Sequence, residues 1–394
     1  MNKKTFRNTI AFAVPALIIL TALTIILSIN RKDDIEGVNN RTVLKYSGPW
    51  YRSYPIMGTW AEISIYGNRK AANKAMDTIH DAFNEVNQIC SRFNPKSELS
   101  CLNATAADKP FKCSPLLWDV LVKSKYYYDL SNGSFDVTIT PLMKLWGFYQ
   151  KQNKIPSDQE IKKALTLVGF DKVIFNSKNR TVFFQKAGMQ IDLGGIAKGY
   201  AVDYAYESIK KHNSYACRKK RHAQVKLNTL KPSSCSKLNQ AGSIKSGVIN
   251  LGGNIRFFPT PPPGKKYYSA GIRNPFNKTK LMNGTLKLLN SSLATSGDYE
   301  KFTILNDQRF THIINPQTGY PVKDMAAVTI VAHFALTCDA LSTAVFINGV
   351  NFANKIHKEF PNIDILIVKG YHDNPKSINT FKIGKIWKNI ALNF

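Results

Sequence analysis

Three glycine-containing segments of this sequence follow apolar stretches and could bring backbone amides close to a phosphate group. They are residues 192–199 (DLGGIAKG), 250–254 (NLGGN) and 295–299 (TSGDY). Glycine lets backbone N–H groups approach phosphate oxygens, and a helix N-terminus adds a favourable dipole. Lys198, one turn into the helix expected after the first segment, could add a positive charge. The pattern is neither a Walker A loop nor G-x-G-x-x-G, and a Gly-Gly pair also occurs in ordinary turns. The segments therefore indicate an anion site without identifying its ligand.

A carboxylate and a hydroxyl follow each other at helical spacing in the segment TCDALSTAV, residues 337–345. Asp339 and Thr343 are four residues apart, so a helix would place both oxygens on one face. Together with backbone carbonyls and phosphate oxygens they would suit Mg²⁺, which prefers hard oxygen ligands. The same spacing also fits a helix that merely carries a capping Asp in its first turn, and both interpretations stay open here.

One histidine stands at the end of an expected strand, immediately before a shaped loop. The turn signals Asn315-Pro316 and Thr318-Gly319 follow His312 closely. A histidine in this position could move a proton or hold a phosphate. A histidine whose hydrogen bonds serve only the fold is the alternative.

The elements that must position these residues can be read from hydrophobic spacing and capping signals. Apolar residues at three- and four-residue intervals predict an amphipathic helix over 70–89. Ser114-Pro115 begins a helix that runs to about residue 130, and Ser157 with Glu160 forms a capping box. The remaining expected elements are a strand over 58–66, hairpins within 172–185 and 302–314, a helix over 196–211 and a strand over 248–251. Because strands and helices do not alternate regularly, we expect an α+β fold of mixed sheets with packed helices.

The charge balance is strongly basic, with 54 Lys and Arg against 26 Asp and Glu and a net charge of +28 in 394 residues. A hydrophobic content of 44% excludes global disorder and a coiled coil. Ten of the basic residues lie between positions 208 and 247, which contain no acid, so we expect an exposed basic insertion at about 212–246. No helix-turn-helix, zinc module or aromatic RNA-binding stripe is visible, so a nucleic-acid partner is not expected.

The N-terminus has the pattern of a membrane anchor. Residues 1–9 carry three basic side chains, and residues 10–29 carry no charge. Twenty residues at about 1.5 Å each match a hydrocarbon core of about 30 Å. We expect a cytoplasmic tip (1–9), a transmembrane signal anchor (10–29), a tether (30–50) and a body (51–394) on the periplasmic side of the inner membrane. A cleaved signal peptide is the alternative.

The six cysteines form no C-x-x-C pair, which disfavours a zinc ribbon. Cys217 and Cys235 could close a loop outside the cytoplasm. Cys90 and Cys338 fall within helical apolar patterns that suit free buried thiols.

Taken in order, the motifs resemble the FAD:protein FMN transferase (ApbE) family. The resemblance begins near residue 54 and covers more than 300 residues. It rests on MGT (57–59), SRF (91–93), SELSCLN (97–103), NGSFDVT (132–138), WGF (146–148), residues 192–203, 250–254, 294–299, 312–321 and 339–343. Two features depart from the family: a lipobox cysteine is replaced by the apparent membrane span, and the basic insertion is extra.

The resemblance implies a T-fold-like arrangement and an enzyme that transfers FMN from FAD, through a phosphoester bond, to a Thr or Ser of an acceptor protein, releasing AMP. It also implies Mg²⁺ held by Asp339, Thr343 and a backbone carbonyl near Gly195. His312 would be a catalytic candidate, together with Lys198 and Asp298 in the motifs that line the nucleotide site. The residues implied to hold FAD are Met57, Asn103, Asp136, Thr138, Trp146, Asp192, Lys198, Asn254, Ser296 and His312.

Acceptors in the resembled family are membrane-bound redox subunits, such as those of Na⁺-pumping quinone reductases and Rnf-type complexes. Two other functions stay open. One is a Mg²⁺-dependent FAD pyrophosphatase that produces FMN and AMP, in which water replaces the acceptor hydroxyl. The other is a non-catalytic flavin-binding protein of the cell envelope.

Overall fold

The computed structural model describes residues 48–150, 152, 154–225, 244–277, 279–371, 374–388 and 390–392; of residues 212–225, 371 and 374–377 it describes the backbone alone. An eight-stranded antiparallel sheet forms the centre of this structure. In spatial order its strands are β1 (Trp50–Ile56), β2 (Thr59–Tyr66), β6 (Ser246–Leu251), β7 (Asn254–Phe257), β10 (Ser292–Gly297), β13 (Met325–Ala332), β14 (Asp364–Tyr371) and β15 (Asn374–Ile383). Three small sheets are β3 (Phe111–Lys112) with β5 (Thr181–Phe184) and β4 (Val173–Asn176), β8 (Tyr268–Ala270) with β9 (Leu286–Leu288), and β11 (Phe302–Leu305) with β12 (Gln308–Thr311). The expected α+β class is confirmed, and all strand pairs of the described residues are antiparallel.

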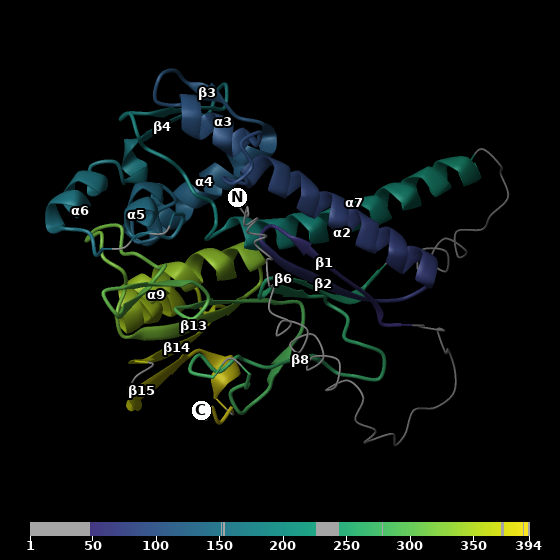
Figure 1. Ribbon diagram of the computed structural model, residues 1–394. Coiled ribbons are helices and arrows are strands. Elements are labelled where there is room, and N and C mark those ends of the chain that lie inside the picture. The colour runs from purple at the N-terminus through teal and green to yellow at the C-terminus, as the bar shows by residue number, and fades with distance from the viewer. Residues whose placement is uncertain are drawn as a thin grey trace, which may run out of the picture.

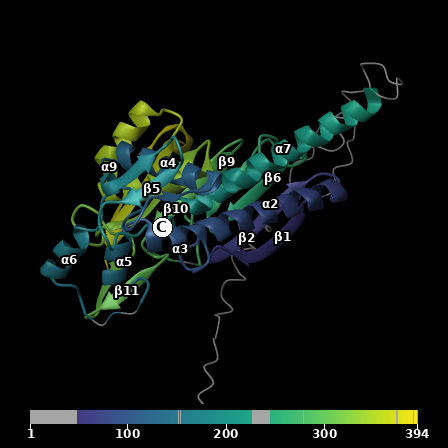
Figure 2. The same cartoon turned by 90° about the horizontal axis from the view of Figure 1, so that it is seen from above.

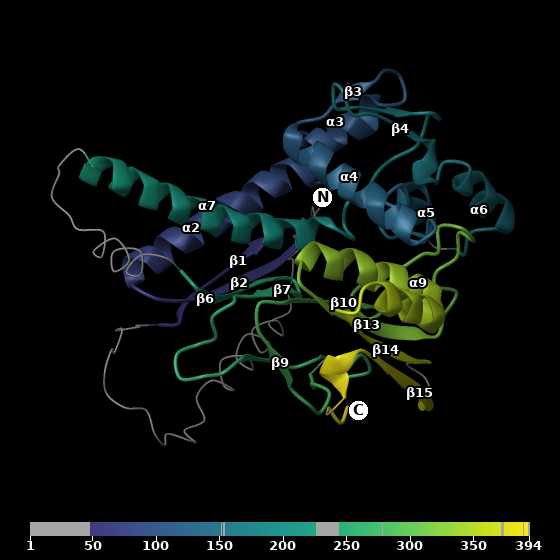
Figure 3. The same cartoon turned by 180° about the vertical axis from the view of Figure 1, so that it is seen from behind.

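Three long helices cover one face of the large sheet. Figure 1 shows α2 (Arg69–Cys90) and α7 (Ala197–Val225) side by side above β1, β2 and β6, with α9 (Ala335–Glu359) above β13 and β14. The other face carries β8, β9 and the 3₁₀ turn η3 (Lys385–Trp387), as the rear view in Figure 3 also shows. All eight residues of β13 are buried, because this strand has protein on both faces.

The four shorter helices gather at one end of the molecule, away from the far end of α7 (Figure 2). They are α3 (Glu98–Thr105), α4 (Pro115–Leu130), α5 (Thr140–Leu145) and α6 (Asp158–Leu165), with the 3₁₀ turn η2 (Phe170–Lys172) after them. The capping predictions are confirmed: Ser114 accepts a hydrogen bond from Leu117 N, and Ser157 and Glu160 form the capping box.

One expected boundary is wrong. The sequence predicts a helix ending at residue 211 and then a basic loop, whereas α7 continues to Val225. Neither glycine nor proline occurs between Gly199 and Pro232, so nothing in the local sequence ends the helix at 211. The first part of the basic insertion is therefore helical, and the rest lies outside the described residues.

Several other predictions also fall outside the described residues, namely the tip, the span at 10–29 and the tether. No helix in the part of the chain that the structure describes is long and apolar enough to cross a membrane. Cys90 and Cys338 are free and buried as expected, and Cys235 lies among the residues left undescribed.

Two tight turns meet at one end of the large sheet. Met57 and Gly58 connect β1 to β2 with φ values of 53° and 69°, and Gly252 and Gly253 connect β6 to β7 with 57° and 87°. Gly252 donates its N–H to the Trp60 carbonyl, and a Cβ on Gly252 would lie 2.4 Å from Oγ1 of Thr59. Only glycine fits this approach. The contact places Met57 and Asn254 at adjacent turns, and the strand register puts the end of β10 at the same end of the sheet.

Candidate functional site

The first turns of α7 and α9 pack directly against each other, and a carboxylate in the second turn of α9 is buried between the two helices. Asp339, on α9, is 6% exposed, and its Oδ2 accepts a hydrogen bond from Gly199 N at 2.9 Å. Its Oδ1 lies 3.8 Å from Nζ of Lys198, which also donates to the Gly194 carbonyl at 3.1 Å. Because α9 begins at Ala335, Asp339 lies beyond the first turn and does not cap its own helix; it accepts a hydrogen bond from α7 instead.

Three distant segments meet one turn further along α9. A Cβ on Gly195 would lie 3.7 Å from Oγ1 of Thr343. The segment 192–196 before α7, called the glycine loop below, therefore passes close to this hydroxyl. Ser296, at the end of β10, has its Oγ 3.3 Å from the same Oγ1 and 2.7 Å from Oγ of Ser342. Asp339 and Thr343 lie on one helix, as their spacing predicts, and Gly195 and Ser296, which the resemblance also implied, both lie near Thr343.

The donor chemistry of this cluster suits a hard cation. No group of three or more His, Cys, Asp or Glu that could hold a metal occurs in the described parts of the chain. A cation here would therefore take one carboxylate, one hydroxyl and backbone oxygens, and would complete its shell from an anionic ligand. That set fits Mg²⁺ rather than a thiolate- or imidazole-binding metal.

The glycine loop is held by side chains from two other regions. The side-chain amide of Asn103 bridges both backbone groups of Ile191, donating to its carbonyl at 2.9 Å and accepting from its N–H at 2.7 Å. Asp192 accepts from Gly194 N at 2.8 Å and from the hydroxyl of Tyr149. Asn103 and Asp192 thus fix the loop that carries Gly195.

His312 follows β12 directly, and its ring has a defined hydrogen bond. Nδ1 lies 2.9 Å from the carbonyl oxygen of Lys301. Because a carbonyl can only accept, Nδ1 carries the hydrogen in the neutral ring and Nε2 keeps its lone pair. Burial of the ring lowers the pKa of His312 to about 4, the positive charges of Lys301 and Lys198 act in the same direction, and Asp298 opposes them. Lys198 and Asp298 are therefore near enough to His312 to shift its pKa.

Asp298 is engaged by an arginine. Nη1 of Arg309 lies 3.4 Å from Oδ2 of Asp298, and Nη2 donates to the Asp298 carbonyl at 3.1 Å. Arg309 therefore engages both the carboxylate and the backbone carbonyl of Asp298.

Three residues implied to bind a ligand make hydrogen bonds within the protein. Asp136 accepts from both the N–H and the hydroxyl of Thr138, and Thr138 Oγ1 in turn accepts from Gly169 N. Burial raises the pKa of Asp136 to about 6, and the bonds from Thr138 oppose that rise. Trp146 is fully buried, and its Nε1 donates to the Gly319 carbonyl at 2.8 Å. Any effect of these side chains on a ligand would pass through the loops they hold.

The side-chain oxygen of Asn254 is buried and accepts no hydrogen bond from the residues that the structure describes. The residue as a whole is 3% exposed. A buried acceptor without a donor costs roughly 1–3 kcal/mol, so such an atom commonly awaits a ligand or an ordered water. Met57, at the adjacent turn, is half-buried.

The structure also shows site residues to which the sequence patterns assigned no role. The Arg92 guanidinium carbon lies 3.6 Å from the Tyr149 ring centroid and 5.0 Å from that of Phe93. Nε of Arg92 is 3.7 Å from Oδ2 of Asp192, so this group joins the glycine loop. Phe93 is 71% exposed, although phenylalanine is usually buried, and it lies next to the half-buried Arg92. The SRF motif just after α2 is the sequence signal that could have identified Arg92 and Phe93 as site residues.

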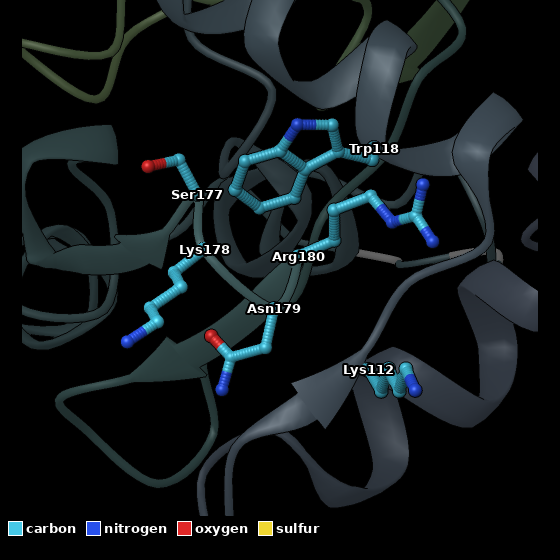
Figure 4. Close-up of a pocket in the computed structure, with 6 residues that line it drawn as sticks. All are labelled: Lys112, Trp118, Ser177, Lys178, Asn179 and Arg180. Atoms are coloured by element: carbon cyan, nitrogen blue, oxygen red, sulfur yellow. The ribbon is translucent and has the colours of Figure 1, made fainter.

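A separate basic hollow contains none of these residues. It has a volume of about 590 Å³ and is lined by Lys112, Trp118, Ser177, Lys178, Asn179 and Arg180. Figure 4 shows Ser177, Lys178, Asn179 and Arg180 along the turn between β4 and β5, with Trp118 and Lys112 on neighbouring elements. The hollow is thus distinct from the cluster around Asp339.

Comparison with known proteins gives consistent matches over most of the chain. The model described as "ApbE family" matches residues 57–217 and 234–367. An FAD:protein FMN transferase of Treponema pallidum is 27% identical over 337 residues, covering 80% of this chain and 83% of that protein. One of Haemophilus influenzae is 27% identical over 291 residues, covering 72% and 75%.

Solved structures match the fold. The ApbE protein of Thermotoga maritima has a TM-score of 0.68 at 26% identity, covering 86% of this chain and 97% of that one. The flavin transferase ApbE of Vibrio cholerae has a TM-score of 0.67 at 22% identity, covering 86% and 98%.

Proposed function

Because this chain belongs to the ApbE family and is an FAD:protein FMN transferase, we propose that it moves the FMN half of FAD onto a Thr or Ser hydroxyl of its acceptor and releases AMP. The bond that breaks joins the FMN phosphorus to the bridging oxygen of the pyrophosphate, and that oxygen leaves with AMP. The bond that forms joins the same phosphorus to the acceptor oxygen. The hydroxyl proton must go to a base.

The observation that carries the proposal is the contact between two distant segments, in which Lys198 lies near Asp339 and Gly195 lies near Thr343. Phosphoryl transfer depends on positioning and charge neutralisation more than on covalent help. Asp339, Thr343 and a backbone oxygen near Gly195 would hold Mg²⁺, which would supply neutralisation of the pyrophosphate charge when bound. Lys198 adds a positive charge, and the amides of the glycine loop offer donors to phosphate oxygens.

His312 is the residue we assign to receive the hydroxyl proton. Its Nδ1 hydrogen is committed to the Lys301 carbonyl, so the proton would arrive at Nε2. Asp298, the other candidate base, pairs with Arg309.

The remaining binding groups can be assigned by chemistry. Exposed Phe93 offers a face on which a flavin ring can stack, with Arg92 and Tyr149 beside it. The buried Oδ1 of Asn254, which has no hydrogen-bond partner in the described part of the chain, can accept from an amino or imide N–H of the bound dinucleotide.

We further propose that the chain is anchored in the inner membrane by residues 10–29, with the catalytic body in the periplasm. The uncharged 20-residue stretch and its basic flank support this placement. A membrane-bound redox subunit, of the Na⁺-pumping quinone reductase or Rnf type, would then be an acceptor within reach.

The function can be tested by incubating the full-length protein with FAD, Mg²⁺ and a purified acceptor domain, followed by gel electrophoresis under ultraviolet light. Transfer makes the acceptor band fluorescent and releases one AMP per flavin attached. Acceptor whose target hydroxyl is replaced by alanine should stay dark. Free FMN and AMP with a dark acceptor would instead identify a pyrophosphatase, and bound FAD with no AMP would identify a flavin-binding protein.

Removing the Asn103 amide should weaken FAD binding more than it slows chemistry. Asn103→Ala leaves the Ile191 N–H and carbonyl without their partner, which loosens the loop carrying Gly195. We expect a rise in the KM for FAD of about tenfold and a loss of about 1–3 kcal/mol of unfolding free energy. Steady-state transfer kinetics and urea unfolding measure the two effects.

Asn348→Ala is the matched control for this prediction. Nδ2 of Asn348 donates to Oγ of Ser134 at 2.6 Å, which also joins two distant segments but not at the glycine loop. This variant should lose stability and keep the KM for FAD. Equal KM values in the Asn103 variant and the unmodified protein would contradict the loop-holding role.

A further inference from the structure

Helices α7 and α9 are joined by a reciprocal pair of carboxylate–amide contacts. Gly199 N of α7 donates to Oδ2 of Asp339 on α9 at 2.9 Å. In return, Ala335 N of α9 donates to Oδ1 of Asp203 on α7 at 3.0 Å. In each helix the donor and the carboxylate are four residues apart, one turn of helix. Each helix thus supplies the acceptor for the first turn of the other.

Asp339 accepts one of the three hydrogen bonds between the helices described here, and Asp203 accepts two. Its Oδ2 also accepts from Leu336 N at 2.9 Å, so both carboxylate oxygens are bonded to the start of α9. The cap residue of α9 is Phe334, which offers no side-chain acceptor, and the first turn of α9 contains no acidic residue. The free amides at a helix start need acceptors. Asp203 supplies from another helix what the α9 sequence lacks.

The backbone before α9 is fixed by further contacts. The buried Arg256 guanidinium and the Ser292 hydroxyl both donate to the His333 carbonyl. At the crossing point, a Cβ on Gly199 would lie 2.5 Å from the Ala335 carbonyl oxygen. The first turn of α9 therefore has little freedom to move relative to α7.

We propose that Asp203 is a positioning residue, which holds the first turn of α9 so that Asp339 and Thr343 meet the start of α7 and the glycine loop before it. The inference rests on the proposed cation site. Asp203 lies one turn beyond the Lys198–Gly199 pair, and its oxygens are bonded to the α9 amides, so it acts through α9. Such outer groups commonly change metal affinity by about 10- to 100-fold when they are replaced.

The test compares Asp203→Asn with Tyr127→Phe in the full-length protein. The side-chain amide introduced by Asp203→Asn would keep one acceptor oxygen but turn an NH₂ group toward the second backbone amide. Tyr127→Phe removes the 2.8 Å hydrogen bond between the Tyr127 hydroxyl and Oγ1 of Thr337, which ties the same first turn of α9 to α4. Both variants weaken an attachment of that turn, but only Asp203→Asn weakens the link to α7.

Binding of Mn²⁺ is measured by the electron paramagnetic resonance signal of free Mn²⁺, with FAD present and the acceptor absent. We expect Asp203→Asn to raise the dissociation constant for Mn²⁺ by about 10- to 100-fold. At saturating Mg²⁺ its kcat for transfer should return to within about threefold of the unmodified protein, because every proposed ligand is retained. Tyr127→Phe should lower the melting temperature and leave Mn²⁺ binding unchanged.

Gly199→Ala provides an independent variant should Asp203→Asn fail to fold. It forces α9 away from α7 without removing any charge, and it should weaken Mn²⁺ binding in the same direction. The proposal is overturned if Asp203→Asn folds and binds Mn²⁺ normally, or if Tyr127→Phe weakens binding equally. Unmodified protein that binds no Mn²⁺ would overturn the proposed cation site itself, and the inference with it.

Discussion

Replacing Asp339 with alanine is expected to abolish Mg²⁺-dependent transfer of FMN to the acceptor. The substitution removes the carboxylate of the cluster and leaves Lys198 and the Gly199 amide without this partner. Loss of charge neutralisation at a phosphoryl centre corresponds to several kcal/mol, so we expect the transfer rate to fall by about a thousandfold or more. Fluorescence of the acceptor band over time, at several Mg²⁺ concentrations, measures the effect.

Asp77→Ala is the control for this substitution. Asp77 forms a 2.7 Å ion pair with Arg52 on the surface, and such exposed pairs contribute about 0–1 kcal/mol. This variant should transfer FMN at the unmodified rate. If Asp339→Ala retained transfer activity while remaining folded, the assignment of Asp339 as a cation ligand would be wrong.

The second large effect is expected at His312. His312→Gln keeps a polar side chain of similar size but removes the basic Nε2, and general-base catalysis contributes about 100- to 10,000-fold. We expect kcat to fall by this amount with little change in the KM for FAD. Single-turnover transfer at saturating FAD isolates the chemical step.

His357→Gln is the matched control. His357 also has its Nδ1 close to a backbone carbonyl, that of Ile363 at 2.7 Å, but it lies in the last turn of α9. Its replacement should leave transfer intact. Equal losses in the two variants would show that histidine removal acts through stability and would refute the base assignment.

The pH dependence follows from the lowered pKa of His312. Because this pKa is about 4 in the folded protein, the ring is neutral and basic above that pH. We expect kcat/KM to fall as the pH drops through about 4, and kcat to fall at a higher pH, since the anionic phosphates of bound FAD raise the pKa of His312. Both acid limbs should disappear in His312→Gln. A profile unchanged by that substitution would exclude His312 as the titrating group.

The same group affects stability with a defined sign. The folded pKa lies below the ordinary value of 6.5, so the unfolded chain binds the proton more readily. The contribution of neutral His312 to the unfolding free energy is complete above about pH 6.5 and is lost as the pH falls toward 4. Urea unfolding at several pH values, compared with His312→Gln, measures it.

Local rules determined much of the fold. Ser114 and the Ser157 capping box begin helices where their side chains can accept the free amides of the first turn. The four-residue spacing of Asp339 and Thr343 was enough to place their oxygens on one face, because a helix repeats every 3.6 residues. Where no local signal existed the expectation was wrong, as at the end of α7, which continues past residue 211 to Val225.

The sequence by itself determined the α+β class, the family and most of the residues that now form the site. Only the tertiary structure decided which of them meet. Gly195 and Thr343 are separated by more than a hundred residues, and their contact exists because α7 and α9 cross at Gly199, where a side chain would strike the Ala335 carbonyl. Trp146 and Thr138 share motifs with the site but are fully buried. Packing of distant segments sets such contacts, and hydrophobic periodicity and capping signals act only between near neighbours in the chain.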